Sequence, residues 1–147
     1  MHSPLLTKTF RRRSVRAIKF RALSNLGKEW VYSNGYYFDG LNYWFTIPGQ
    51  GNMAIAWAGA IRVLPETIGQ FTGLHDKNGT EIYEGDYIKW QEGKDIEHYE
   101  IRFSSAMFWC RSFTDGEYST TLAMFNTEAI EVIGNIHEAD TTKAHED

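Results

Sequence analysis

Cysteine is nearly absent from this sequence, which holds one such residue, Cys110, among its 147. A single thiol forms no disulfide within the chain, so stability is expected to rest on a hydrophobic core in a reducing compartment. Cys110 lies in the apolar run that begins at Met107, and no His or Asn nearby completes a recognisable catalytic dyad. We therefore interpret Cys110 as a small core side chain rather than a reactive thiol.

Long apolar runs are also missing. The longest mainly apolar stretch, Met53 to Leu64, is interrupted by Gly59 and Arg62 and is far shorter than the roughly 20 residues of a membrane-spanning helix. The first 20 residues contain no apolar segment of signal-peptide length. These absences predict a protein of the bacterial host cytoplasm with no membrane partner.

Acidic residues are absent from the first 14 positions, which carry Lys8 and the run Arg11 to Arg13. We expect a disordered leader and leave three interpretations open: translated sequence upstream of a true start at Val15, a solvated tail, or a basic arm that contacts nucleic acid phosphates. Residues 15–147 keep 11 of the 15 Lys and Arg and all 19 Asp and Glu, a net charge of −8. The polar tail, 139–147, is also expected to be disordered.

Aromatic residues, 15% of the chain, are plentiful in its first half, where short Gly and Asn breaks separate them. This composition is typical of short strands joined by turns. Asn34-Gly35 predicts a hairpin between 31–32 and 36–38. Asp39-Gly40 predicts a further turn into a strand over 41–47. The segment 53–64 fits a helical turn or a strand equally well.

The second half has clearer strand and turn signals. Phe71 to Leu74 and Glu81 to Tyr83 flank Asp76 to Gly79, which predicts a hairpin, and Glu84 to Asp86 predicts another turn. Further strands are expected over 87–90, 98–103, 107–112, 122–125 and 131–137. We predict a mainly β fold, with an N-terminal β subdomain over 15–64, a helical turn at 65–68 and an SH3-like small barrel within 65–138.

Three blocks together resemble one known family. They are IKFRA from Ile18, PETIGQFTGLHDKNGTEIYEGDYIKW from Pro65, and EVIGNIHE from Glu131. In this order they resemble the YopX-like proteins of bacteriophages and prophages. The signature turn residues that the last two blocks contribute are Gly73, Asp76, Asn78, Gly79, Gly85, Asp86, Gly134 and Asn135.

The resemblance covers about residues 18 to 138. It implies a two-part β fold that assembles into rings or other homo-oligomers, and the family has no established activity. The chain departs from the family pattern in two places: Leu23 stands where a Trp is common, and the stretch from Tyr43 to Ala60 matches no pattern of the family. A function located in that stretch does not follow from the resemblance.

The sequence offers few groups for chemistry. The carboxylates Asp76, Glu81, Glu84 and Asp86 could converge on a cation, but they lack EF-hand spacing, and Asp76 and Asp86 are typical turn formers. No histidine has zinc-ligand spacing: His75, His98, His137 and His145 are interpreted as surface residues, and His2 lies in the leader. Nucleophile motifs and phosphate-binding glycine loops are also missing. We expect no catalytic, metal or cofactor site.

Two functions remain. The first is a homo-oligomeric interaction protein that binds itself and a host or phage protein, because a small β protein rarely hides so many aromatic residues within one subunit. Its candidate contacts are Trp44, Phe45 and Trp57. The alternative is a nucleic-acid-binding module, which the acidic body disfavours. Its candidate contacts are Lys89, Trp90, Arg102, Trp109 and Arg111.

Overall fold

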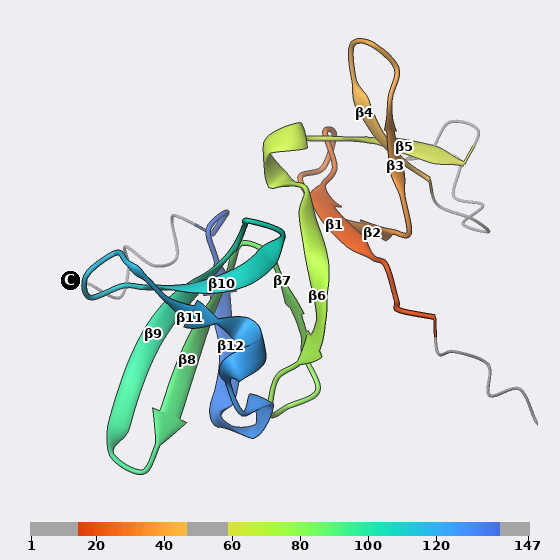
Figure 1. Cartoon of the computed structure of the whole chain (residues 1–147). Coiled ribbons are helices and arrows are strands. Elements are labelled where there is room, and N and C mark those ends of the chain that lie inside the picture. Colours follow the sequence, from red (N-terminus) through yellow and green to blue (C-terminus); the bar gives the residue numbers. More distant parts are fainter. Residues whose placement is uncertain (1–14, 47–58, 139–147) are drawn as a thin grey trace, which may run out of the picture.

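The computed structural model describes residues 15–46 and 59–138 (Figure 1). The mainly β prediction is confirmed, since the strands of these residues form three antiparallel sheets. None of the helices in the described part is long and apolar enough to span a membrane. The predicted leader, the predicted tail and Trp57 lie outside the described residues.

A four-stranded sheet joins the two halves of the chain. Its order is β2 (Trp30–Ser33), β1 (Phe20–Leu23), β6 (Gly69–His75) and β7 (Glu81–Tyr83). The β1–β6 pairing places Phe20 opposite Gln70 and Arg21 opposite Gly69. Because β6 and β7 belong to the segment predicted as a barrel, this sheet crosses the expected boundary between 64 and 65.

A three-stranded sheet contains β3 (Tyr36–Phe38), β4 (Tyr43–Thr46) and β5 (Ala60–Val63). The hairpin predicted at Asn34-Gly35 is wrong, since β2 pairs with β1 and β3 pairs with β4. The Ser33 hydroxyl explains part of this, because its oxygen lies 2.6 Å from the carbonyl oxygens of both Gly35 and Thr46 and can donate its one hydrogen to either. This contact directs the chain into the second sheet. The predicted turn at Asp39-Gly40 connects β3 to β4, with Gly40 at φ +97°.

A five-stranded sheet forms the C-terminal part, and a short 3-10 turn at Pro65–Thr67 precedes β6, where a helical turn was predicted. The sheet order is β11 (Tyr118–Thr121), β10 (Met107–Ser112), β9 (Asp95–Ser104), β8 (Asp86–Glu92) and β12 (Ile130–Asn135). These strands form an open sheet, and the described strands close no barrel, because β7 pairs with β6, and β6 pairs with β1 of the N-terminal half. The strand predicted over 122–125 is wrong: Leu122–Met124 forms a 3-10 turn, and a second follows at Thr127–Ala129.

The described residues bury two apolar clusters. One cluster lies on the inner face of the five-stranded sheet and contains Ile82, Ile88, Ile101, Cys110, Leu122 and Ile130. The other lies between the two N-terminal sheets and contains Ala22, Phe45, Ile61 and Val63. Cys110 is a core residue, as predicted: it is completely buried, and burial raises the pKa of its thiol to about 12.

The hairpin predicted around Asp76 to Gly79 is confirmed as the β6–β7 connection, with Gly79 at φ +79°. Gly85 has φ +90° and lies between β7 and β8. A Cβ atom at Gly85 would lie 3.4 Å from two side-chain carbons of Ile136, so the position is restricted by both backbone and packing.

The variant Gly85→Val should lower the free energy of unfolding by roughly 1–3 kcal/mol, because valine is strained at this φ and crowds Ile136. Gly35→Val is a matched control, since a Cβ atom at Gly35 would have no heavy atom within 4 Å and the φ angle there is not positive. Urea unfolding of both variants measures the difference. Equal stability of the two would contradict this role of Gly85.

Candidate functional site

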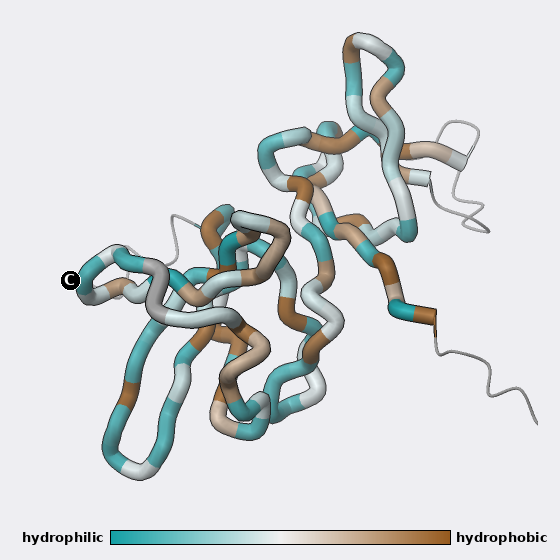
Figure 2. The backbone as a smooth tube through the Cα atoms, viewed as in Figure 1, coloured by the Kyte–Doolittle hydropathy of each residue, from teal (hydrophilic) through white to brown (hydrophobic). Residues whose placement is uncertain are grey.

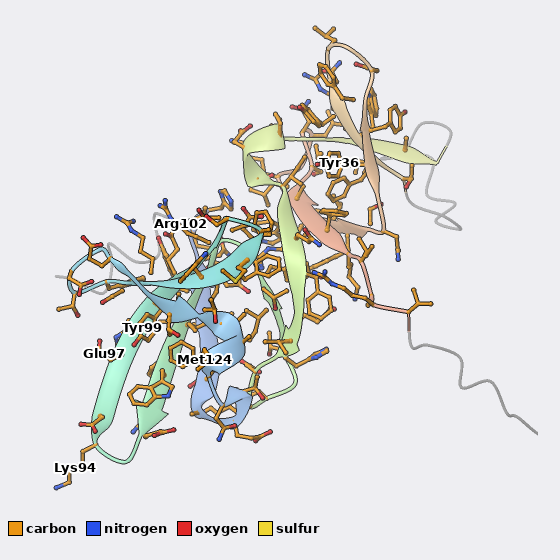
Figure 3. The ribbon with its side chains drawn as sticks, viewed as in Figure 1. Tyr36, Lys94, Glu97, Tyr99, Arg102 and Met124 are labelled. Carbon is orange, nitrogen blue, oxygen red and sulfur yellow. The ribbon has the colours of Figure 1, made fainter. Side chains whose placement is uncertain are left out.

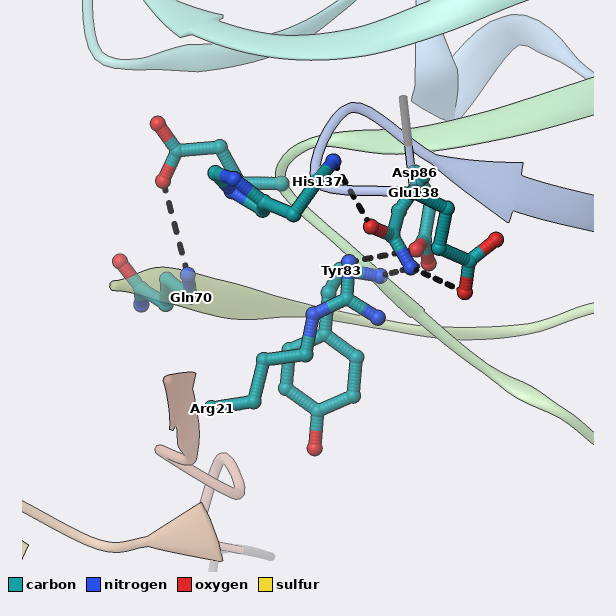
Figure 4. Close-up of polar contacts among 8 residues, drawn as sticks. Arg21, Gln70, Tyr83, Asp86, His137 and Glu138 are labelled. Atoms are coloured by element: carbon teal, nitrogen blue, oxygen red, sulfur yellow. Dashed lines mark hydrogen bonds and ion pairs between the residues drawn. The ribbon is translucent and has the colours of Figure 1, made fainter. Parts of the chain in front are cut away.

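A buried ion pair connects the N-terminal and C-terminal sheets. The Arg21 guanidinium of β1 lies 2.6 Å from the Asp86 carboxylate of β8, and the two side chains are 9% and 1% exposed (Figure 4). The Tyr83 backbone amide donates to the other Asp86 oxygen at 2.8 Å. Burial raises the pKa of Asp86, and the positive charge of Arg21 opposes this rise.

Aromatic rings enclose the arginine. The Arg21 guanidinium lies 4.6 Å from the Trp30 ring centroid and 4.8 Å from that of Tyr83. Trp30 in turn contacts His137, whose pKa burial lowers, with a further decrease from the charge of Arg21. The Arg21 Nε and the Tyr83 hydroxyl are buried without a hydrogen-bond partner in the described structure. The site is therefore a tightly packed junction in which two polar groups are left unsatisfied.

The candidate acidic cluster does not converge on one point. Glu81 accepts from Lys19 at 2.6 Å, and Asp86 is paired with Arg21. Asp76 is buried and accepts backbone amides, from Asn78 and Thr80 within its turn and from Val132 of β12, at 2.8–2.9 Å. Among residues 15–46 and 59–138, no group of three or more acidic, His or Cys side chains could hold a metal ion.

The signature residues of the last block stabilise the C-terminal end of the sheet. Asn135 is buried, its side-chain oxygen accepts from the His137 amide at 2.9 Å, and its amide nitrogen donates to Glu138 at 2.9 Å. Gly134 lies beside a register shift in the β12–β8 pairing. Gly73 similarly lies at an irregularity between β6 and β7, with φ +90°. These residues shape strand ends and present no exposed chemical site.

The nucleic-acid candidates divide between the two faces of the five-stranded sheet. The strand registers place Lys89, Arg102, Trp109 and Arg111 on the outer face. Trp90 points to the opposite face, where it packs against the core and contacts Phe125. Trp90 was therefore wrongly grouped with the other four, because a strand alternates its side chains between the two faces.

The outer-face cations lie among acidic partners. Lys89 lies 3.7 Å from Glu131, and Glu100 pairs with both Arg102 and Arg111. The Trp109 indole nitrogen donates to the Ser104 carbonyl at 2.9 Å. The adjoining β8–β9 hairpin is mainly hydrophilic (Figure 2). This face thus carries aromatic and basic groups without an excess of unpaired positive charge.

The predicted interface residues Trp44 and Phe45 differ in their exposure to solvent. Phe45 is completely buried, so its ring is part of the core and not of a surface. Trp44 is half-buried, and its indole nitrogen donates to Asp39 at 2.8 Å. Both belong to β4, beside the edge strand β3, and the β3–β4 hairpin extends away from the five-stranded sheet (Figure 1).

Three consecutive exposed aromatic residues form β3, next to β4, where the sequence placed the interface; Tyr32, Phe103 and Phe113 are similarly exposed on other segments. Tyr36, Tyr37 and Phe38 are 45%, 46% and 55% exposed, and β3 has a neighbour, β4, on one side. Sequence reasoning missed this edge because it paired β3 with β2. It also missed Arg21, whose partner is 65 residues away in the chain.

The family model of the YopX protein matches residues 19–141. This chain belongs to the YopX family. The match includes all three sequence blocks except the first residue, Ile18, and confirms the resemblance found in them. Among curated proteins, no match was found.

One similar solved structure is the crystal structure of protein EF1440 from Enterococcus faecalis. It is 24% identical to this YopX-family chain, and the alignment covers 85% of this chain and 96% of the other, with a TM-score of 0.47.

Removing Arg21 should destabilise the YopX-family fold strongly. Arg21→Met leaves the Asp86 carboxylate buried and unpaired, which costs about 3–5 kcal/mol of unfolding free energy. Lys19→Met is the control, because its pair with Glu81 is about one-third exposed and is expected to contribute at most about 1 kcal/mol. Chemical denaturation of both variants provides the comparison. Similar losses in the two would show that the junction does not depend on the buried pair.

The Asp76 carboxylate should make stability depend on pH. Burial alone raises its pKa, but the amides of Val132, Thr80 and Asn78 outweigh burial, so the pKa lies below the ordinary 3.8. A lowered folded-state pKa means that the carboxylate stabilises the fold above about pH 3.8 and loses this effect as the pH falls through the folded value.

Asp76→Asn is therefore expected to lower the unfolding free energy at pH 7 by about 1–3 kcal/mol, and the difference should shrink below about pH 3.8. Asp95→Asn, at the exposed first residue of β9, is the control and should change stability little. Thermal melts between pH 2.5 and 7, values chosen to span that ordinary pKa, supply the measurement. A difference that stays constant over this range would exclude the charge as its origin.

Proposed function

We propose that this YopX-family chain is a non-enzymatic interaction protein, encoded by a phage or prophage, that assembles with copies of itself and acts by binding a host or phage protein. The observation that carries the proposal is the edge strand β3, whose three residues are all aromatic and about half exposed. Exposed aromatic groups of this kind are typical of the centres of protein interfaces.

The geometry of β3 suits pairing with another strand. The Asp39 amide donates to the Asn42 carbonyl, so alternation along the hairpin directs the backbone groups of Tyr36 and Phe38 away from β4. No charged residue interrupts Tyr36–Phe38, although soluble proteins commonly protect an edge strand with lysine or proline. The strand therefore presents donors, acceptors and rings together.

A second copy would fit this edge through a two-fold axis at Tyr37. In an antiparallel arrangement, Tyr36 of each subunit lies opposite Phe38 of the other, and the outward backbone groups of these residues form hydrogen-bonded pairs. Aromatic cross-strand pairs contribute roughly 0.2–1 kcal/mol each. The three-stranded sheet would thereby continue from one subunit into the next.

Two further observations support a role in binding rather than catalysis. The one thiol is completely buried. The carboxylates of Glu81, Asp86 and Glu100 each form an ion pair with a Lys or Arg side chain of the same chain. Nucleic-acid binding by the outer face is less well supported, because its cations lie beside Glu100 and Glu131.

Tyr37→Lys should shift the native mass toward the monomer, since it places like charges opposite each other at the proposed axis. Ile96→Lys is the matched control: Ile96 is 48% exposed and lies on β9, away from β3. Light scattering at low and moderate salt gives the mass, and the ratio of absorbance at two wavelengths reports bound nucleic acid.

A defined oligomer free of nucleic acid, which Tyr37→Lys dissociates and Ile96→Lys does not, is the expected result. A monomeric wild type would overturn self-assembly. An oligomer that survives Tyr37→Lys would show that the subunits meet elsewhere. Salt-sensitive association with nucleic acid would favour the alternative function.

A further inference from the structure

A cavity of about 320 Å³ lies between the three-stranded sheet and β6. Its walls come from β1, β3, β4, the segment from the 3-10 turn into β6, and the connection between β7 and β8, and Figure 3 labels Tyr36, one of the lining residues. The lining residues are Phe20, Tyr36, Tyr43, Pro65, Ile68, Gln70 and Glu84. The cavity is large enough for the end of one long side chain.

Three of its walls are aromatic. The Phe20 and Tyr36 rings lie 5.1 Å apart at 89°, so they form two perpendicular walls. The Tyr43 ring follows at 6.1 Å from Tyr36, inclined by 48°. Aromatic faces carry partial negative charge and attract cations, and a box of such rings is the usual way in which proteins enclose an ammonium group.

The remaining polar wall contains a carboxylate, Glu84, that forms no ion pair within the described residues. Glu84 is half-buried, and the hydrogen bond found for its side chain is a long one, 3.5 Å from the Gln70 amide. By contrast, Glu81 and Asp86, which lie close to it in the chain, each have a cationic partner. Burial raises the pKa of Glu84, and the Gln70 amide opposes this only in part. A positive group in the cavity would offset the unfavourable burial of this charge.

We infer that this cavity binds the cationic end of a lysine or arginine side chain that a partner protein supplies. The aromatic walls would enclose the alkyl stem and the charged group, and Glu84 would accept hydrogen bonds from it. The net charge of −8 over residues 15–147 would attract a basic segment toward this surface. The inference goes beyond self-assembly, because Tyr36 presents its ring to the cavity and its backbone to the β3 edge.

The test titrates Nα-acetyl-lysine methylamide and the corresponding arginine compound into the protein. Binding is measured from the backbone amide ¹⁵N chemical shifts of the protein. Saturable shifts are expected at the amides of Gln70 and Glu84, with none from the neutral norleucine compound. Glu84→Gln should weaken binding at least about tenfold, because it removes the charge and keeps the shape. Glu66→Gln is the control, since Glu66 is a nearby carboxylate that does not line this cavity.

Thermal melts accompany the titrations, and Glu84→Gln should melt no lower than the wild type, because it removes a half-buried charge. Tyr36→Leu tests the aromatic wall. It should weaken binding of the lysine and arginine compounds several-fold and should not increase binding of the norleucine compound. Equal binding of norleucine and lysine compounds, or unchanged binding to a folded Glu84→Gln protein, would overturn the inference. Neither result would bear on the native mass, so the proposed self-assembly is tested separately.

Discussion

The buried pair between Arg21 and Asp86 is the interaction on which the arrangement of the two halves depends. Arg21 lies on β1 and Asp86 begins β8, so one contact links the N-terminal sheets to the five-stranded sheet. Taking two charges out of water is costly unless each is well bonded. The Tyr83 amide bonds to Asp86, and the rings of Trp30 and Tyr83 contact Arg21. The pair therefore fixes the orientation of β1 relative to β8 as much as it adds stability.

This junction lies where the two halves of the chain share a sheet. β6 continues the N-terminal sheet through its pairing with β1, while β7 leads directly into β8 of the C-terminal sheet. Ile82 of β7 belongs to the C-terminal core, and Ile68, just before β6, packs against the N-terminal core. The N-terminal hairpin β3–β4 is thereby held on a framework that includes both halves, although no strand of the described residues pairs with its outer edge.

The same framework places an aromatic edge beside an aromatic cavity. The ring of Tyr36 lines the cavity, and its backbone lies on the open side of β3. We propose that both features bind proteins, since strands pair through backbone groups and basic side chains are attracted to aromatic rings. On the outer face of the five-stranded sheet, Lys89 and Arg111 lie beside Glu131 and Glu100, which makes that face a poorer site for phosphates.

The sequence by itself determined the family, the β class, the β6–β7 hairpin and the burial of Cys110, because these follow from local turn chemistry, hydrophobic pattern and contiguous motifs. Tertiary structure decided which strands pair: Asn34-Gly35 permits a hairpin, but the register of β1 with β2 and the bonds of Ser33 direct the chain elsewhere. It also decided the site. The partner of Arg21 and the aromatic residues that line the cavity with Glu84 come from distant segments, and contacts over such separations depend on packing that local pattern does not encode.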